Sequence, residues 1–451
     1  MKQIISYILP IISFFPQHIC AQSIEQLFDL ADSQSTQIVI SQSGLEAASE
    51  ALSDARAALL PDLTLSVSGS YIGNATLMKR NFSTSGTTDV IVAGFGPQPV
   101  ENGSQKTPHW GNSFCARATQ VIYAGGAIRS GIRMAELSEE LARLDTERQR
   151  QEVHFLIVGF YLDLCNLHNQ LQVIDQNISL TEAVIKNMEV RHKQGTVLKN
   201  DLTRYELQLM SLRLTREKIS DAANIINHRL STTLHLPEDN KVSIDSLSIS
   251  NLLSHLPNLN VENYQQTASE SNLTIRMASV GQQLSEQKIK SSRSSLLPSV
   301  ALVVEDNLSG PYTTDLIPVD ANVNVWYIGL GVKFDLGNHW KSKHNLRQAK
   351  VEHRQSTQKT ALARENIENT VHADFVNYQT AFKEVQTQEK QVELAEQNYS
   401  IVENRYRSDM ALLTDMLDAS NMKLSADMSL ADARIQLLYC YYKLLYTTGA
   451  L

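Results

Sequence analysis

Two long stretches of the chain repeat apolar residues every three or four positions, a spacing that predicts amphipathic helices. The apolar positions of the first stretch are 153, 157, 160, 164, 167, 171, 174, 178, 185 and 188. Only Thr181 is polar where the series expects an apolar residue, and 367–402 repeats the spacing less strictly. Alternating steps of four and three form the seam of a coiled coil. Proline is absent from 127–190 and 340–402, so each helix reaches on the order of 100 Å at 1.5 Å per residue.

A second pattern, alternation of apolar with polar or small residues, precedes each long helix and predicts β-strands. It is clearest in 63–71, where serine and threonine alternate with leucine, valine, glycine and tyrosine, and in 326–334. One apolar and one polar face over about ten residues is typical of an outer-membrane barrel strand, although a half-buried soluble sheet gives the same pattern. The predicted strands are 62–72, 113–123, 299–307 and 322–334.

Four strands do not close a membrane barrel, because the smallest spanning barrels have eight strands and lipid leaves an open sheet edge without hydrogen-bond partners. Several protomers must therefore contribute to one wall if the strands enter a membrane. This argument permits two, three or more protomers.

The chain is a duplicated unit. Arg191 maps onto Arg405 at a shift of 214 positions, and the same shift relates Leu198 to Leu412, Asp201 to Asp415 and Leu230 to Leu444. Upstream, Leu-Leu-Pro at 59–61 recurs at 296–298, a shift of 237. We place the 23 extra residues in the polar stretch 71–112 of the first copy. Such internal repetition predicts a repeated supersecondary unit, and 235–260, with two prolines, is predicted to connect the copies.

The first residues are typical of a secretory signal peptide. Lys2 supplies the positive charge, an apolar run from 4 to 15 follows, and Ala21 precedes the expected cleavage site. The apolar run is too short for a membrane-spanning anchor, which is the weaker alternative. Cys20 raises a lipoprotein alternative, but Ile19 fits a lipid-acceptor site poorly, so we expect the mature chain to begin at Gln22 without lipid.

Composition narrows the class of protein. The 451 residues are 42% hydrophobic with a net charge of −8, which excludes a disordered chain and disfavours nucleic acid as a partner. Cys115, Cys165 and Cys440 lie too far apart for a metal motif or a disulfide framework. His154 and His168 are fourteen positions apart rather than four, so no zinc site is expected. We therefore expect neither catalysis nor a metal or other cofactor.

The segment 405–419, Arg-Tyr-Arg-Ser-Asp-Met-Ala-Leu-Leu-Thr-Asp-Met-Leu-Asp-Ala, resembles a motif of the TolC family of outer-membrane efflux proteins. In that motif an aromatic residue precedes a turn and an Asp-x-Leu-Asp-Ala run follows it. Tyr-Ala-Gly-Gly at 123–126 is similar to the family's Tyr-x-Gly-Gly element, whereas the second copy has Phe-Asp-Leu-Gly at 334–337. The resemblance covers nearly the whole mature chain.

The resemblance implies an α+β membrane protein in which a β-hairpin and a long coiled-coil helical hairpin occur twice. It implies a homotrimer with a 12-stranded transmembrane β-barrel on a periplasmic α-helical tunnel, in contact with outer-membrane lipid. The expected segments are a signal peptide at 1–21, a periplasmic helical segment at 22–60, a first barrel strand pair with a long extracellular loop at 61–124, a first helical hairpin at 125–234 with its tip near 191–202, an equatorial connector at 235–260, an ascending helix at 261–297, a second barrel strand pair at 298–336, and a second helical hairpin with the C-terminal end at 337–451, its tip near 405–418.

Four residues are candidates for a periplasmic gate. Asp415 and Asp418 are three positions apart and so project from one side of a helix; three chains would place six carboxylates near one axis. The resemblance implies that this ring is the constriction, whereas the alternative is that an aspartate in a first helical turn favours the helix dipole. The resemblance also implies a hydrogen bond from Tyr406 to Asp201 in the shut state. The family's tip arginine aligns with Ala411, which removes one expected link.

The tips also hold candidates for turns and for a partner surface. Gly195 is expected to permit the first tip turn, and Asp409, its counterpart, also tolerates left-handed backbone geometry. Four apolar residues are candidates for contact with a periplasmic adaptor protein, with packing inside the coiled coil as the alternative: Val197, Leu198, Leu412 and Leu413.

The expected function is passive export through the outer membrane of substrates delivered by an adaptor and an inner-membrane pump of the RND or ABC type. A second possibility within the family is the exit duct of a type I protein secretion system. A third, from another class, is a secreted structural coiled-coil protein without a pore. The expected location is the cell outer membrane with a large periplasmic portion.

Overall fold

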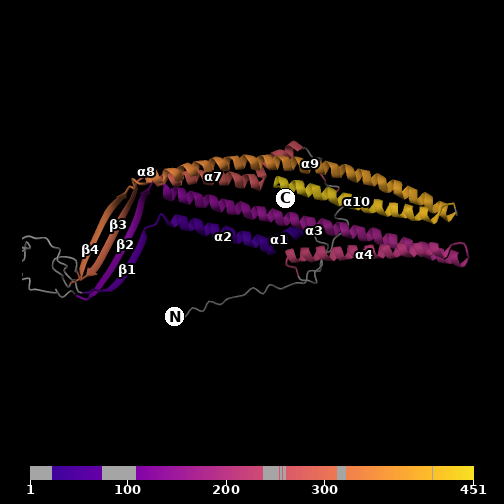
Figure 1. Ribbon diagram of the computed structural model, residues 1–451, viewed down its shortest axis with the longest axis horizontal. Coiled ribbons are helices and arrows are strands. Elements are labelled where there is room, and N and C mark those ends of the chain that lie inside the picture. Colours follow the sequence, from indigo (N-terminus) through magenta and orange to yellow (C-terminus); the bar gives the residue numbers. More distant parts are fainter. Residues whose placement is uncertain are drawn as a thin grey trace, which may run out of the picture. The chain divides into compact units, whose positions relative to one another are not determined.

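The computed structural model describes residues 23–73, 108–236, 253, 256, 261–311, 321–408 and 410–451. The predicted signal peptide with Cys20, most of the predicted extracellular loop and nearly all of the predicted connector lie outside these residues. The elements, shown in Figure 1, are α1(Ile24–Gln34), α2(Thr36–Ala57), β1(Asp62–Tyr71), β2(Trp110–Ala124), α3(Ala127–Lys193), α4(Lys199–Thr233), α6(Val261–Ser271), α7(Leu273–Ser294), β3(Ser299–Gly310), β4(Val323–Lys333), α8(Asn338–Lys341), α9(Lys343–Arg407) and α10(Leu413–Thr448).

The chain folds as two compact units. One, which we call the strand unit, comprises 50–136 and 284–353. The other, which we call the helix unit, comprises the rest of the chain, with described residues in 23–49, 137–283 and 354–451. No helix in the described ranges combines the length and apolar character needed to cross a membrane.

The strand unit holds one antiparallel sheet in the order β1-β2-β3-β4. Each predicted strand is present, with ends that differ by at most three residues from the prediction. β2 and β3 pair directly, from Asn112 opposite Gly310 to Ala124 opposite Ser299, so the hairpins of the two repeats share one sheet. A bulge between Val121 and Tyr123 shifts the register near the end of β2, which turns Tyr123 to the opposite face of the strand.

Two helices dominate the helix unit, α3 with 67 residues and α9 with 65. The predicted seam of α3 is largely buried, including Val153, Ile157, Ile174 and Met188. Thr181, the one polar residue of that seam, is also buried, and its hydroxyl donates to the Asn177 carbonyl oxygen at 2.8 Å. That bond within the helix explains why a polar residue is tolerated there. The duplicated α-helical hairpin and the four-stranded sheet confirm the predicted fold class for the chain.

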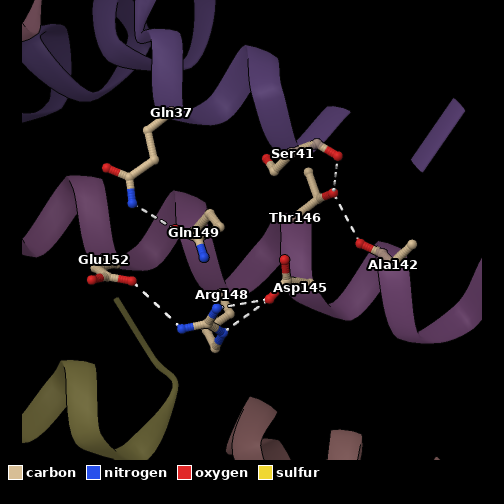
Figure 2. Close-up of polar contacts among 8 residues, drawn as sticks. All are labelled: Gln37, Ser41, Ala142, Asp145, Thr146, Arg148, Gln149 and Glu152. Carbon is tan, nitrogen blue, oxygen red and sulfur yellow. Dashed lines mark hydrogen bonds and ion pairs between the residues drawn. The ribbon is translucent and has the colours of Figure 1, made fainter. Parts of the chain in front are cut away.

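Polar contacts hold α2 against α3 (Figure 2). The Gln37 side-chain amide donates to Gln149 Oε1 at 2.6 Å, and the Thr146 hydroxyl lies 3.1 Å from the Ser41 carbonyl oxygen. Arg148 points away from α2 and pairs with acidic residues of its own helix. In this part of the α2–α3 contact the hydrogen bonds are neutral, each with a net worth of about 1 kcal/mol. Farther along the same two helices, Arg56 forms an exposed ion pair with Glu136 at 3.6 Å.

A second polar cluster joins α1 to α3 around the Asp32 carboxylate. His154 Nε2 lies 2.9 Å from Asp32 Oδ1, Arg150 forms an ion pair with the same carboxylate, and the His154 ring stacks on Phe28 with centroids 4.2 Å apart. Burial lowers the pKa of His154, and the hydrogen bond to Asp32 only partly opposes this. The folded chain therefore favours a neutral His154.

Acidification is expected to loosen α1. Because the folded pKa of His154 is below its ordinary value of 6.5, the stabilisation is present above pH 6.5 and is lost as the pH falls through the lowered folded pKa. Hydrogen–deuterium exchange should give lower protection factors for 24–34 at pH 5 than at pH 7.5. His154→Gln should remove most of that difference, and equal protection of the wild-type chain at both pH values would contradict the expectation.

Candidate functional site at the helical tips

The first tip is the turn between α3 and α4. Gly195 has φ +78°, a left-handed conformation that its missing Cβ makes accessible. The Gly195 N–H donates to the His192 carbonyl oxygen at 2.9 Å, and the Thr196 N–H donates to the Arg191 carbonyl oxygen at 3.0 Å. These bonds satisfy the last carbonyl groups of α3 and close the turn, so the structure places Gly195 where the turn needs it.

The second tip is the turn between α9 and α10. Asp409, the predicted counterpart of Gly195, lies outside the described residues. The Met410 N–H donates to the Arg405 carbonyl oxygen at 2.8 Å, and Asp415 Oδ2 accepts from the Leu412 N–H at 3.1 Å. Asp415 therefore caps the first turn of its own helix. An acidic residue in this first turn also favours the helix dipole, which is the alternative to the gate. Asp415 remains exposed at the tip.

Residues of four helices next to these turns form one apolar cluster. We call this cluster the tip core. Its buried members are Ile185, Met188, Tyr205, Tyr399, Leu413, Met416 and Ala419, with Val197, Leu202, Val402 and Tyr406 among the partly buried residues around them. The tip core ties the α3–α4 hairpin to the α9–α10 hairpin within one chain. Movement of either tip must therefore disturb packing shared by both.

Two tyrosines are buried in the tip core with their hydroxyl groups unpaired. Neither the Tyr205 nor the Tyr399 hydroxyl has a hydrogen-bond partner among the described residues. Burial raises the pKa of Tyr205 and raises the pKa of Tyr399 to about 12. Both side chains are therefore neutral at physiological pH. Tyr399 belongs to the predicted apolar series of 367–402, but its buried hydroxyl group and the position of Tyr205 follow only from the packed register of the four helices.

The gate candidates are only partly brought together. Tyr406 lies at the edge of the tip core, and the Arg191 guanidinium carbon is 5.8 Å from its ring centroid, a cation–π distance. The contacts described for Asp201 include no hydrogen bond to the Tyr406 hydroxyl, so that bond stays a prediction for the assembled tips. Asp418 is exposed, and its carboxylate has no ion pair or hydrogen bond within the described ranges.

The four apolar tip candidates divide into two pairs. Val197 and Leu413 pack into the tip core, whereas Leu198 and Leu412 are 72% and 70% exposed. The exposed pair occupies equivalent positions of the two repeats, directly before α4 and α10. Met410, which sequence reasoning omitted, is also exposed. Leu198, Leu412 and Met410 are thus apolar side chains that the tips expose to solvent.

Ion pairs repeat along both helical hairpins. Arg216 and Arg213 of α4 bind Asp175 and Glu182 of α3 at 2.7 Å each. The shift of 214 maps these acids onto Glu389 and Glu396 of α9, which bind Arg434 and Lys423 of α10. Each exposed pair contributes at most about 1 kcal/mol. The seven-residue spacing of the acids was the sequence signal for this pattern.

No group of three or more histidine, cysteine or acidic side chains in the described ranges could hold a metal ion.

Comparisons with known proteins agree with this architecture. Residues 264–449 match the family described as outer membrane efflux protein. The outer membrane protein TolC of Salmonella enteritidis is 21% identical over 443 residues, covering 96% of this chain and 82% of that protein.

Two solved structures illustrate the similarity of fold. The outer membrane protein VceC of Vibrio cholerae superimposes with a TM-score of 0.75 at 15% identity, over 94% of this chain and 96% of VceC. The open state of the MtrE outer membrane channel of Neisseria gonorrhoeae gives a TM-score of 0.72 at 15% identity, over 94% of this chain and 88% of MtrE.

Proposed function

Because the chain belongs to the TolC family of outer membrane efflux proteins, we propose that three copies form a duct through which an inner-membrane pump and a periplasmic adaptor export their substrates. The family consists of outer-membrane channels, and the chain's location is the cell outer membrane. In this proposal the strand pairs span the membrane, the long helices form a periplasmic tunnel, and 235–260 is an equatorial connector. The exposed apolar face of the sheet is the observation that supports this proposal.

One face of the sheet is apolar and exposed. Val67 is 73% exposed in β1, and Ile328 and Leu330 of β4 are exposed on the same face, which the strand register connects across all four strands. Among the described strands this face carries one charged residue, Asp306, which lies opposite Trp326. Isolated exposed apolar residues are common, but a sheet face this largely apolar indicates contact with another apolar phase. In a membrane this face contacts lipid.

Aromatic residues border that apolar face at both ends. Tyr71, Trp110 and Trp326 lie at or near the strand ends where the chain passes from one strand of a hairpin to the next. Tyr123 and Phe334 lie at the opposite ends, where the chain continues toward a helix. All five are exposed. Rows of aromatic residues at the two interfaces are typical of transmembrane barrels, so the apolar band has the borders that a bilayer requires.

The opposite face is polar and suits a water-filled lumen. Arg117, Glu305 and Tyr327 lie side by side on adjacent strands: Arg117 binds Glu305 at 2.7 Å, and the Tyr327 hydroxyl donates to Glu305 Oε2 at 2.9 Å. Serine and threonine occupy this face of β1. The charges of Arg117 and Glu305 cancel, so this pair adds little net charge to the lumen.

The two outer strands leave the sheet open. β1 pairs only with β2 and β4 only with β3 among the described strands, and lipid does not satisfy such edges. β4 of one chain therefore pairs with β1 of the next, and three chains supply the twelve strands implied by the family resemblance. The protomer alone is not a functional unit.

The proposal is tested by isolating the protein from membranes. Crosslinking in native membranes should stop at a trimer, the trimer should resist heating in detergent, and the purified trimer should conduct ions in planar lipid bilayers. A folded protein that is predominantly monomeric in detergent and produces no conductance would overturn the proposal.

A further inference from the structure

The repeat places opposite charges at equivalent positions of the two tips. The shift of 214 that maps Asp201 onto Asp415 maps Arg204 onto Asp418. Each lies in the second turn of its helix, α4 or α10. The second repeat therefore has an acidic pair where the first repeat has Asp201 and a guanidinium. Arg204 and Asp418 thus carry opposite charges at equivalent positions of the two repeats and can attract each other.

The two helices are already in contact one turn farther from the tip. The Gln208 side-chain amide donates to Asn421 Oδ1 at 2.8 Å, which joins α4 to α10. Arg204 precedes Gln208 by four positions and Asp418 precedes Asn421 by three, so each shares a helix face with its contact residue. The charged side chains thus lie on the facing sides of α4 and α10, between the Gln208–Asn421 contact and the tip.

Neither charge is paired in the isolated chain. Arg204 and Asp418 are both exposed, and neither side chain has an ion pair or hydrogen bond within the described part of the chain. Farther along the same helix, Arg213 and Arg216 do bind acids of α3. Arg204 therefore differs from Arg213 and Arg216, because its guanidinium has no acidic partner among the described residues.

We propose that Arg204 is the counter-ion of Asp418 in the closed duct, forming an ion pair between α4 and α10 of the same chain when the three tips converge. This inference rests on the proposed function. In one chain, an exposed pair gains little because water solvates both groups. Around the axis, the carboxylates of three chains create a negative potential that draws each guanidinium inward. The three Arg204 side chains then halve the net charge of the ring formed by Asp415 and Asp418.

Charge exchange tests the pair in purified trimers in planar bilayers. Arg204→Glu and Asp418→Arg should each raise the resting conductance, on the order of tenfold for the three pairs of a trimer. The double variant Arg204→Glu with Asp418→Arg should return the conductance close to the wild-type value. The matched control is Arg213→Glu, which breaks an exposed ion pair with Glu182 on α3 and should leave the resting conductance unchanged. Retention of heat-resistant trimers verifies assembly of each variant.

A second measurement does not depend on the reversed charges. Arg204→Ala leaves the carboxylates of the ring uncompensated, so block by a trivalent cation such as hexamminecobalt should tighten on the order of tenfold. Additive effects in the double exchange, or an unchanged block in Arg204→Ala, would overturn the Arg204–Asp418 pair while wild-type conductance still supported the duct. A wild-type protein that neither forms trimers nor conducts would overturn both proposals.

Discussion

Val67→Arg is expected to abolish assembly of the heat-resistant trimer. Val67 lies near the middle of β1 on the apolar face and is exposed in the protomer. An arginine on the lipid face of a transmembrane barrel costs about 2–4 kcal/mol near the bilayer midplane, and a trimer carries this cost three times. Heat-resistant trimer in outer-membrane fractions, measured by gel electrophoresis without boiling, should fall below detection.

Ser68→Arg is the matched control for that substitution. Ser68 is the next residue of β1 and projects to the polar face. There the guanidinium remains in water, so the amount of trimer should stay near that of the wild-type protein. If both arginine variants assembled equally well, the apolar face would not contact lipid, and the interpretation of the sheet as part of a barrel would be wrong.

The double variant Asp415→Asn with Asp418→Asn is expected to abolish block by multivalent cations and to remove the cation preference of the closed pore. The variant removes every carboxylate of the proposed ring, and with them the negative potential that concentrates cations. The asparagine side chain keeps an oxygen that can accept the Leu412 N–H now bound by Asp415. Trimer assembly should therefore be unchanged, and planar-bilayer recordings with and without a trivalent cation measure the effect.

A neutral substitution elsewhere on α10 controls for loss of charge alone. Asp432 accepts from Asn166 and Gln170 of α3 at 2.8 Å and lies about four turns farther from the tip than Asp418. Asp432→Asn should leave cation block in place. If the double tip variant retained its block, Asp415 and Asp418 would be ordinary residues of a helix start, and the constriction would lie elsewhere.

Hydrophobic spacing predicted the long helices because the heptad seam of α3 is buried against neighbouring helices over most of its length. The prediction was weaker for α9, whose less regular series includes Phe382, an exposed residue in the chain. Spacing records which face of a helix is apolar, but not whether another chain is needed to cover that face. Alternation likewise predicted the strands, because it shows that each strand has an apolar and a polar face. It does not show what each face contacts.

The details of the tips required the structure. The resemblance directed attention to Tyr406 and Asp201, yet the ring of Tyr406 meets Arg191 across the two hairpins. That contact depends on the packing of four helices, which no local spacing reveals. The hydrogen bond from the Leu412 N–H to Asp415 has a sequence signal, an acidic residue at the third helical position, although the signal does not separate a capping role from a gating role.

The pairing of β2 with β3 imposes an order on folding. Arg117 and Glu305, which meet across this pair, are 188 residues apart in the chain. Contacts of such long range form slowly, because closing so long a loop costs conformational entropy before the contact is made. The first hairpin is exported well before its partner strand and keeps an unpaired apolar edge during that interval. Such an edge is prone to aggregation. The first hairpin can therefore aggregate until β3 has been exported and pairs with β2. Until then the hairpin has to be protected from aggregation in the periplasm.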